Sequence, residues 1–198
     1  MIATQENREA IVNSQTLIIV AAIVVAIVIL AVAWMYSQRQ RRVRLRERFG
    51  PEYDRAVHEA GEPAKAEAVL EDRARRVDRL KIRPLSREQA DSFTREWRRI
   101  QARFVDDPND AVAEADRLVA QVMAARGYPL DDFDTRAADL SVDHPRVVEN
   151  YRLARAIAQR RERGEAQTEE LRQAVVHFRT LFEDLLEVSD RDVKRRAS

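Results

Sequence analysis

Three histidines, His58, His144 and His177, are the side chains of this 198-residue chain best suited to acid–base or metal chemistry at neutral pH. None belongs to a His-Glu-x-x-His motif or a Cys/His cluster, and the chain contains no cysteine. Asp143, next to His144, leaves one arrangement open, a hydrolase that uses His144 with neighbouring carboxylates. We favour a helix-start role for His144 and a boundary position for His177. The sequence therefore predicts no catalytic, cofactor-binding or metal-binding residues, and no enzyme.

Two acidic clusters have the composition of calcium loops: Asp106-Asp107-Asn109-Asp110 and Asp131-Asp132-Asp134. Neither has the glycine at position six or the glutamate at position twelve that such a loop requires. Both stand where a helix N-terminus favours carboxylates, so we predict that they cap helices. The four separated glycines form no phosphate-binding loop, and a net charge of +1 argues against a surface built for nucleic acid.

The longest apolar stretch covers residues 17–36, which are twenty residues without charge, proline or glycine. A helix of this length spans about 30 Å, the hydrocarbon thickness of a bilayer. Trp34 and Tyr36 stand at its end, where aromatic rings prefer the headgroup level. We predict a transmembrane helix over 17–36 that follows a short extracytoplasmic N-terminus, 1–16. A buried core helix is a weaker alternative, because it would need a much larger protein around it.

A cleaved signal peptide is the stronger alternative, because Ala31-Val32-Ala33 has the small-x-small form of a cleavage site. However, the preceding segment carries Glu6, Arg8 and Glu9, whereas a signal peptide needs a positive start. The apolar run is also longer than that of a usual signal peptide. We therefore expect the helix to be retained as an anchor.

Arginines are concentrated on one side of the apolar stretch. Arg8 alone precedes it, whereas six arginines follow it: Arg39, Arg41, Arg42, Arg44, Arg46 and Arg48. The positive-inside rule then places the C-terminal domain in the cytoplasm of a single-pass membrane protein. We predict that these six arginines, with Trp34 and Tyr36, lie at the membrane interface. They could serve only as a topology signal, or also bind anionic lipid headgroups; nucleic-acid binding is disfavoured, because no aromatic residues alternate with them.

The rest of the chain has helical periodicity, with helix breaks at Gly50-Pro51 and at Gly61-Glu62-Pro63. Residues 37–84 are predicted to form basic juxtamembrane and spacer helices. Within them, residues 64–80 carry an apolar stripe that fits a packed spacer helix or, alternatively, a short coiled-coil dimer. Residues 85–188 are predicted to form a helical bundle, and 189–198 a disordered tail.

The bundle helices are delimited by capping residues. Ser86 and Gln89 form a capping box, and Phe93, Trp97, Ile100 and Phe104 share the face that we predict to be the centre of the core. Predicted helix starts follow at Asp107, Asp131 or Asp132, Asp143-His144-Pro145 and Thr168. The fold class is therefore all-α, a single N-terminal transmembrane helix followed by a helical bundle.

Several runs carry a resemblance to a known family: LRERFGPEYDRAV, IRPLS, FVDDP, ADRLVAQVMAARGYP, RAADLSVDHPRVVENYR and TEELRQAVVHFRTLFEDLL. They cover most of the chain after the apolar stretch. The chain resembles an uncharacterised family of bacterial proteins from GC-rich genomes, labelled only as membrane or secreted proteins. The resemblance implies an N-terminal hydrophobic segment and a helical domain, and no assigned activity, cofactor or catalytic residues.

Three functions remain open at this point. We favour a membrane-anchored helical interaction or scaffolding module that binds another protein or itself. The alternatives are an envelope-associated protein with the same domain outside the membrane and, less favoured, the His144 hydrolase. Self-association through the membrane helix has only a weak signal, the small residues Ala22 and Ala26.

Overall fold

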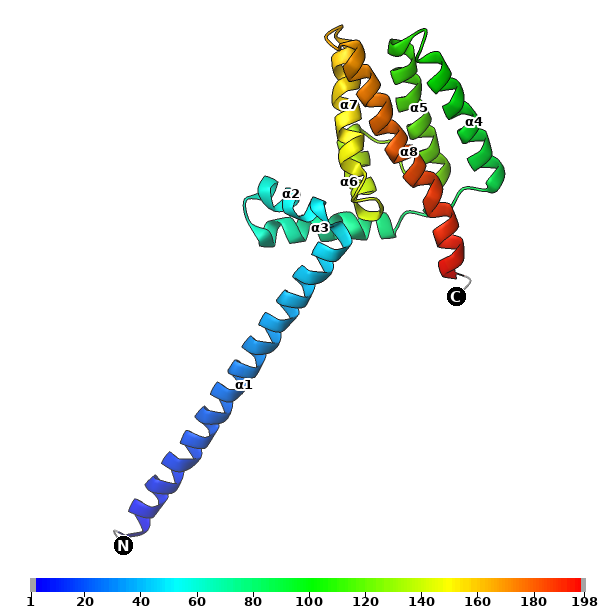
Figure 1. The fold of residues 1–198 in the computed structure, drawn as a ribbon. Coiled ribbons are helices and arrows are strands. Elements are labelled where there is room, and N and C mark those ends of the chain that lie inside the picture. Colours follow the sequence, from blue (N-terminus) through cyan, green and yellow to red (C-terminus); the bar gives the residue numbers. More distant parts are fainter. Residues whose placement is uncertain (1–2, 197–198) are drawn as a thin grey trace. The chain divides into compact units, whose positions relative to one another are not determined.

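The computed structural model describes the backbone of residues 3–196 and the side chains of residues 22–186. This part of the chain folds into helices joined by short turns, with no β-strand among the described residues (Figure 1). The helices are α1 (Ala3–Phe49), α2 (Pro51–Ala60), α3 (Pro63–Asp78), α4 (Arg87–Arg103), α5 (Pro108–Arg126), α6 (Phe133–Asp143), α7 (Val148–Glu162) and α8 (Thr168–Arg196). The chain divides into two compact units, Met1–Arg44 and Leu45–Ser198. The predicted all-α fold class is confirmed.

The first unit consists of α1 up to Arg44. Its described large apolar side chains before residue 37 are all at least half exposed, from Ile23 at 52% to Leu30 at 69%. Among the described residues, Ala22–Phe49 is the one helix long and apolar enough to cross a membrane, and it lies near the N-terminus, where a signal sequence would also stand. The side chains of residues 17–21, the start of the predicted span, lie outside the described part.

In the second unit, helices α4 to α8 enclose the larger of two hydrophobic clusters, which we call the bundle core. Its most deeply buried side chains come from α5, α7 and α8, and α8 packs against both α5 and α7. Helix α4 packs against α5, and its Trp97 stacks on Phe182 of α8 with ring centroids 4.9 Å apart. The prediction that α4 forms the centre of the core is therefore wrong. Phe93 and Phe104 are only partly buried, because α4 lies at the edge of the bundle.

The smaller cluster, which we call the hairpin core, joins the end of α1 to α2 and α3. It contains Leu45, Phe49, Tyr53, Ala56, Ala66, Leu70, Ala74 and Val77, together with Val142 of α6. The apolar stripe predicted on residues 64–80 is thus used inside the chain, and Ala74 occupies the inward position next to the partly exposed Arg73. This packing supports a spacer helix, since the stripe is covered without a second copy.

Most predicted caps are found in the structure. Ser86 and Gln89 form a reciprocal capping box, Asp107 accepts a hydrogen bond from the Asp110 amide, and Asp132 accepts one from the Thr135 amide. The backbone N–H and the hydroxyl of Thr135 both donate to the Asp132 carboxylate and lower its pKa, which favours the charged form at this helix end.

One predicted helix start is wrong, and at a second, correctly placed start the capping contact differs from the predicted one. Asp143 is the last residue of α6 and His144 follows it as the C-terminal cap, whereas α7 begins at Val148 without a side-chain cap. Thr168 is the first residue of α8, and the amide before it, that of Gln167, donates to Glu170. In both places a nearby tertiary or helix-internal partner replaces the expected local cap. Helix α8 runs to Arg196, and the side chains of the predicted tail, 189–198, lie outside the described part.

Candidate functional site

The predicted interface residues on the first unit present an aromatic and cationic surface. Trp34 and Tyr36 are exposed by 65% and 64%, and the Tyr36 hydroxyl accepts a hydrogen bond from Gln40 2.8 Å away. Tyr36, Arg39, Gln40, Val43 and Arg44 line one shallow hollow of about 380 Å³ on this helix. Rings, guanidinium groups and an exposed valine on one surface match the mixed polarity of a lipid headgroup layer.

Arg46 and Arg48 have a different environment from the arginines before them. They belong to the second unit, where Arg46 pairs with Asp54 of α2 at 2.9 Å and Arg48 with Asp78 of α3 at 3.0 Å. Arg46 also lies over the Tyr53 ring, 5.3 Å from its centroid. Both side chains stay substantially exposed, but their charge is shared with carboxylates of the folded domain. The structure therefore separates them from Arg39, Arg41, Arg42 and Arg44.

His144 forms an enclosed polar pair with Asp184. Its Nδ1 lies 2.5 Å from Oδ2 of Asp184 on α8, and the His144 side chain is only 1% exposed. A histidine oriented by a carboxylate is the arrangement of a general base. Here the Nε2 atom that would act is buried and has no hydrogen-bond partner, so a substrate atom cannot reach it in this conformation. The geometry fits a link between the end of α6 and α8, which the sequence did not reveal because Asp184 lies 40 residues away.

The remaining predicted polar residues are not brought together. His177 is half-buried at the edge of α8 and its Nδ1 lies 2.8 Å from the Asn150 side-chain oxygen, as expected for a boundary histidine. His58 is exposed on α2. Among the described residues, no group of three histidine, cysteine, aspartate or glutamate side chains is arranged to hold a metal ion.

A buried polar cluster joins α5, α6 and α7. Asp116 pairs with Arg155 at 2.9 Å, and burial raises the pKa of Asp116 although Arg155 and Arg136 oppose this. Burial likewise raises the pKa of Tyr151, to about 12, and its hydroxyl has no hydrogen-bond partner among the described residues. These charged and polar groups sit between three helices that share the bundle core, so the cluster restrains how the helices pack.

A second set of ion pairs connects the hairpin to the bundle. Glu52 of α2 is buried, and both of its carboxylate oxygens accept hydrogen bonds from Arg152 of α7, at 2.5 and 2.8 Å. On the other side, Arg76 of α3 contacts Asp131 at 2.8 Å and the buried Asp139 of α6 at 3.2 Å. We call these contacts the polar junction. They are long-range contacts between distant segments, for which the sequence carries no local signal.

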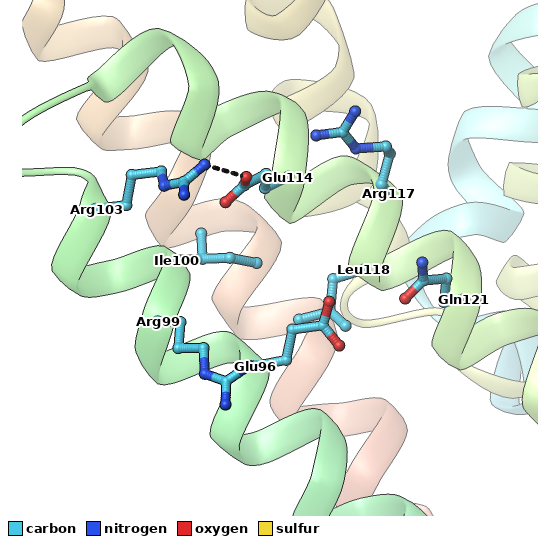
Figure 2. A pocket seen from close by; sticks show the side chains of 8 residues that line it. All are labelled: Glu96, Arg99, Ile100, Arg103, Glu114, Arg117, Leu118 and Gln121. Atoms are coloured by element: carbon cyan, nitrogen blue, oxygen red, sulfur yellow. Dashed lines mark hydrogen bonds and ion pairs between the residues drawn. The ribbon is translucent and has the colours of Figure 1, made fainter.

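A groove lined by five charged side chains lies between α4 and α5 (Figure 2). This groove has a volume of about 440 Å³ and is lined by Glu96, Arg99, Ile100, Arg103, Glu114, Arg117, Leu118 and Gln121. Arg103 reaches across to Glu114 at 2.5 Å, whereas Arg99 and Arg117 have no ion-pair partner among the described residues. The buried side chains of Ile100 and Leu118 form its floor.

Sequence reasoning missed this groove, although one signal was present. Arg95, Arg99 and Arg103 recur at four-residue spacing on α4, a pattern that places like charges next to one another. The sequence did not show that α5 would lie beside this row and form the other side of the groove. In comparisons with protein-family models, curated protein sequences and solved structures, no match to this chain is found.

Proposed function

We propose that this protein is a membrane-anchored helical interaction module, with α1 crossing the bilayer once and the domain of α2 to α8 on the cytoplasmic side. The observation that carries the proposal is the apolar surface of α1 before residue 37, whose described large side chains are all at least half exposed. In water this surface would be costly, at about 25 cal/mol for each Å² of apolar area. A lipid bilayer is the environment that removes this cost for a helix of this length.

Three further observations support an interaction role. The domain has a separate bundle core, so it can hold a fixed surface. In the pair of His144 with Asp184, the Nε2 atom of His144 is buried, so a substrate atom cannot reach it in this conformation. The groove between α4 and α5 carries exposed charges without partners.

Membrane insertion is tested by fractionation of cells that express the full chain. We expect the protein to stay in the membrane pellet after alkaline carbonate extraction. Placing an arginine in the apolar segment, Ile27→Arg, costs about 3 kcal/mol of insertion free energy at the centre of a span and should release part of the protein. Ile27→Leu is the matched control and should behave as the unmodified chain. A carbonate-soluble wild-type protein, or a mature chain that begins after Ala33, would exclude the anchor.

Orientation is tested with reporters fused after Ser198. A fluorescent protein should mature and alkaline phosphatase should stay inactive if the domain is cytoplasmic. Replacing Arg39, Arg41, Arg42 and Arg44 with glutamine should weaken this preference, since these arginines precede the folded domain. Arg46 and Arg48 are left unchanged because they pair with Asp54 and Asp78. Active alkaline phosphatase on the wild-type chain would instead support the envelope-associated alternative.

A further inference from the structure

The groove between α4 and α5 contains charges that no contact in the described chain explains. We propose that this groove binds an acidic segment of a partner protein, with Arg99 and Arg117 as the residues that recognise its carboxylates. The proposal rests on the interaction role above and gives that role a location and a partner chemistry.

The arginine row on α4 places three like charges next to one another on one helix. Arg95, Arg99 and Arg103 follow one another at four-residue spacing, where like charges destabilise a helix by about 0.2–0.5 kcal/mol per pair. Glu114 neutralises Arg103 across the groove. Arg99 and, on the opposite helix, Arg117 have no carboxylate within ion-pair distance among the described residues. A bound anion would offset this repulsion.

Elsewhere on the bundle and hairpin, several exposed arginines are paired locally, although others, such as Arg79 and Arg146, have no ion-pair partner among the described residues. Arg55 contacts Glu59, Arg172 contacts Glu169, and Arg179 contacts Glu183, each within one helical turn and at 2.6–2.8 Å. Local pairing is therefore common on this surface. The groove differs because two arginines without an ion-pair partner among the described residues, Arg99 of α4 and Arg117 of α5, line the same hollow (Figure 2).

The composition of the groove favours a peptide over a surface of uniform negative charge. Glu96 and Glu114 lie among the arginines, so a nucleic acid or an anionic bilayer would meet like charges there. A peptide offers separate carboxylates for Arg99 and Arg117, amide donors for Glu96 and apolar side chains for the floor. A volume of about 440 Å³ is large enough for several side chains of such a segment.

The test uses the full chain in nanodiscs of phosphatidylcholine, which carries no net charge. The probe is a fluorescein-labelled helical peptide with glutamates on one face and leucines on the other, and its binding is followed by fluorescence anisotropy. We expect the wild-type chain to bind this peptide with an affinity that falls as salt is added. The double variant Arg99→Glu/Arg117→Glu should bind it at least tenfold more weakly.

Two controls separate this site from general charge. Arg79→Glu/Arg146→Glu makes the same change in net charge at exposed arginines outside the groove and should retain wild-type affinity. A peptide with lysine in place of each glutamate should not bind. Circular dichroism checks the fold of each variant, and Arg99→Gln/Arg117→Gln, which only removes charge, should still lose several-fold affinity if the reversal variant unfolds.

Equal loss of affinity in the two reversal variants, or no peptide binding by the wild-type chain, would overturn the proposal. So would binding to phosphatidylglycerol vesicles or to DNA that depends on Arg99 and Arg117 while the peptide fails to bind. Because the protein is placed in nanodiscs beforehand, these results are independent of the orientation measured with the fusions. A failure of the groove therefore leaves the anchor intact, and a failure of the predicted topology leaves the peptide measurement valid.

Discussion

The bundle core and the hairpin core are built from the same kinds of residue but held in different ways. The bundle core is closed by large side chains from α4 to α8, including Tyr151, Phe178 and Leu181, which are completely buried. The hairpin core relies on fewer large residues and several alanines, and it buries the carboxylates of Glu52 and Glu67. The bundle also buries polar groups, among them Arg126 and His144, but its apolar core is the larger one. We therefore expect the smaller hairpin core to depend more on its polar partners, above all at the polar junction.

The comparison predicts different consequences for equivalent large-to-small substitutions. Phe178→Ala in the bundle core should lower the free energy of unfolding by about 4 kcal/mol, because it leaves a cavity among close-packed helices. Leu70→Ala in the hairpin core should cost about 3 kcal/mol and should act mainly on residues 45–80. Hydrogen exchange of the full chain measures both, with faster exchange in α5 and α8 expected only for the first variant. Equal exchange patterns would show that the two cores unfold as one.

The next largest loss of stability is expected when the polar junction is broken. Arg152→Met removes the guanidinium that satisfies both oxygens of the buried Glu52, and an unpaired buried charge costs about 3 kcal/mol. We expect faster hydrogen exchange in α2, and a partial recovery in Glu52→Gln/Arg152→Met. The control is Arg55→Met, which removes an exposed pair between the same two helices and should cost less than about 1 kcal/mol. An effect of Arg152→Met no larger than the control would contradict the dependence on this pair.

Two glycines with left-handed backbone, one in each region, differ in how close the neighbouring main chain lies. Gly127 ends α5 at φ +101°, and a Cβ there would lie 2.8 Å from the carbonyl oxygen of Lys81. Gly127→Ala should cost about 2–3 kcal/mol, since the left-handed backbone and the contact with main-chain atoms both oppose it. Gly61 in the hairpin has φ +72° but open space around it, so Gly61→Ala should cost about 1 kcal/mol. Urea unfolding monitored by Trp97 fluorescence in a Trp34→Phe background measures the difference, and equal losses would contradict the close approach.

The smallest predicted effect concerns pH at the polar junction. Burial raises the pKa of Asp139 above its ordinary value of 3.8, and Arg76 opposes this shift. In the interval between the ordinary and the raised pKa, the folded chain keeps a proton that the unfolded chain has lost, so the free energy of unfolding falls as pH rises. Asp139→Asn should remove this part of the pH dependence. The measurement is the urea midpoint of both proteins at a series of pH values above 3.8, and parallel profiles would contradict the shift.

Most local features of the domain were predictable from the sequence. The break at Gly50-Pro51, the capping box of Ser86 and Gln89, and the end of α5 at Gly127 all follow from residues next to one another. The local interpretation failed at Asp143-His144, which ends α6 instead of starting a helix. There, His144 pairs with Asp184, which lies 40 residues away in the sequence. Local caps are predicted well only when no tertiary contact competes with them.

By itself, the sequence determined the helical class, the exposed apolar helix with its arginines, and the residues that start and end most of the other helices, because these depend on periodicity and on neighbours along the chain. The tertiary structure alone decided that α5, α7 and α8 provide the centre of the core, that Glu52 meets Arg152, and that Arg99 and Arg117 face one groove. These contacts join residues far apart in the chain. Their partners are chosen by the packing of whole helices, which no short stretch of sequence encodes.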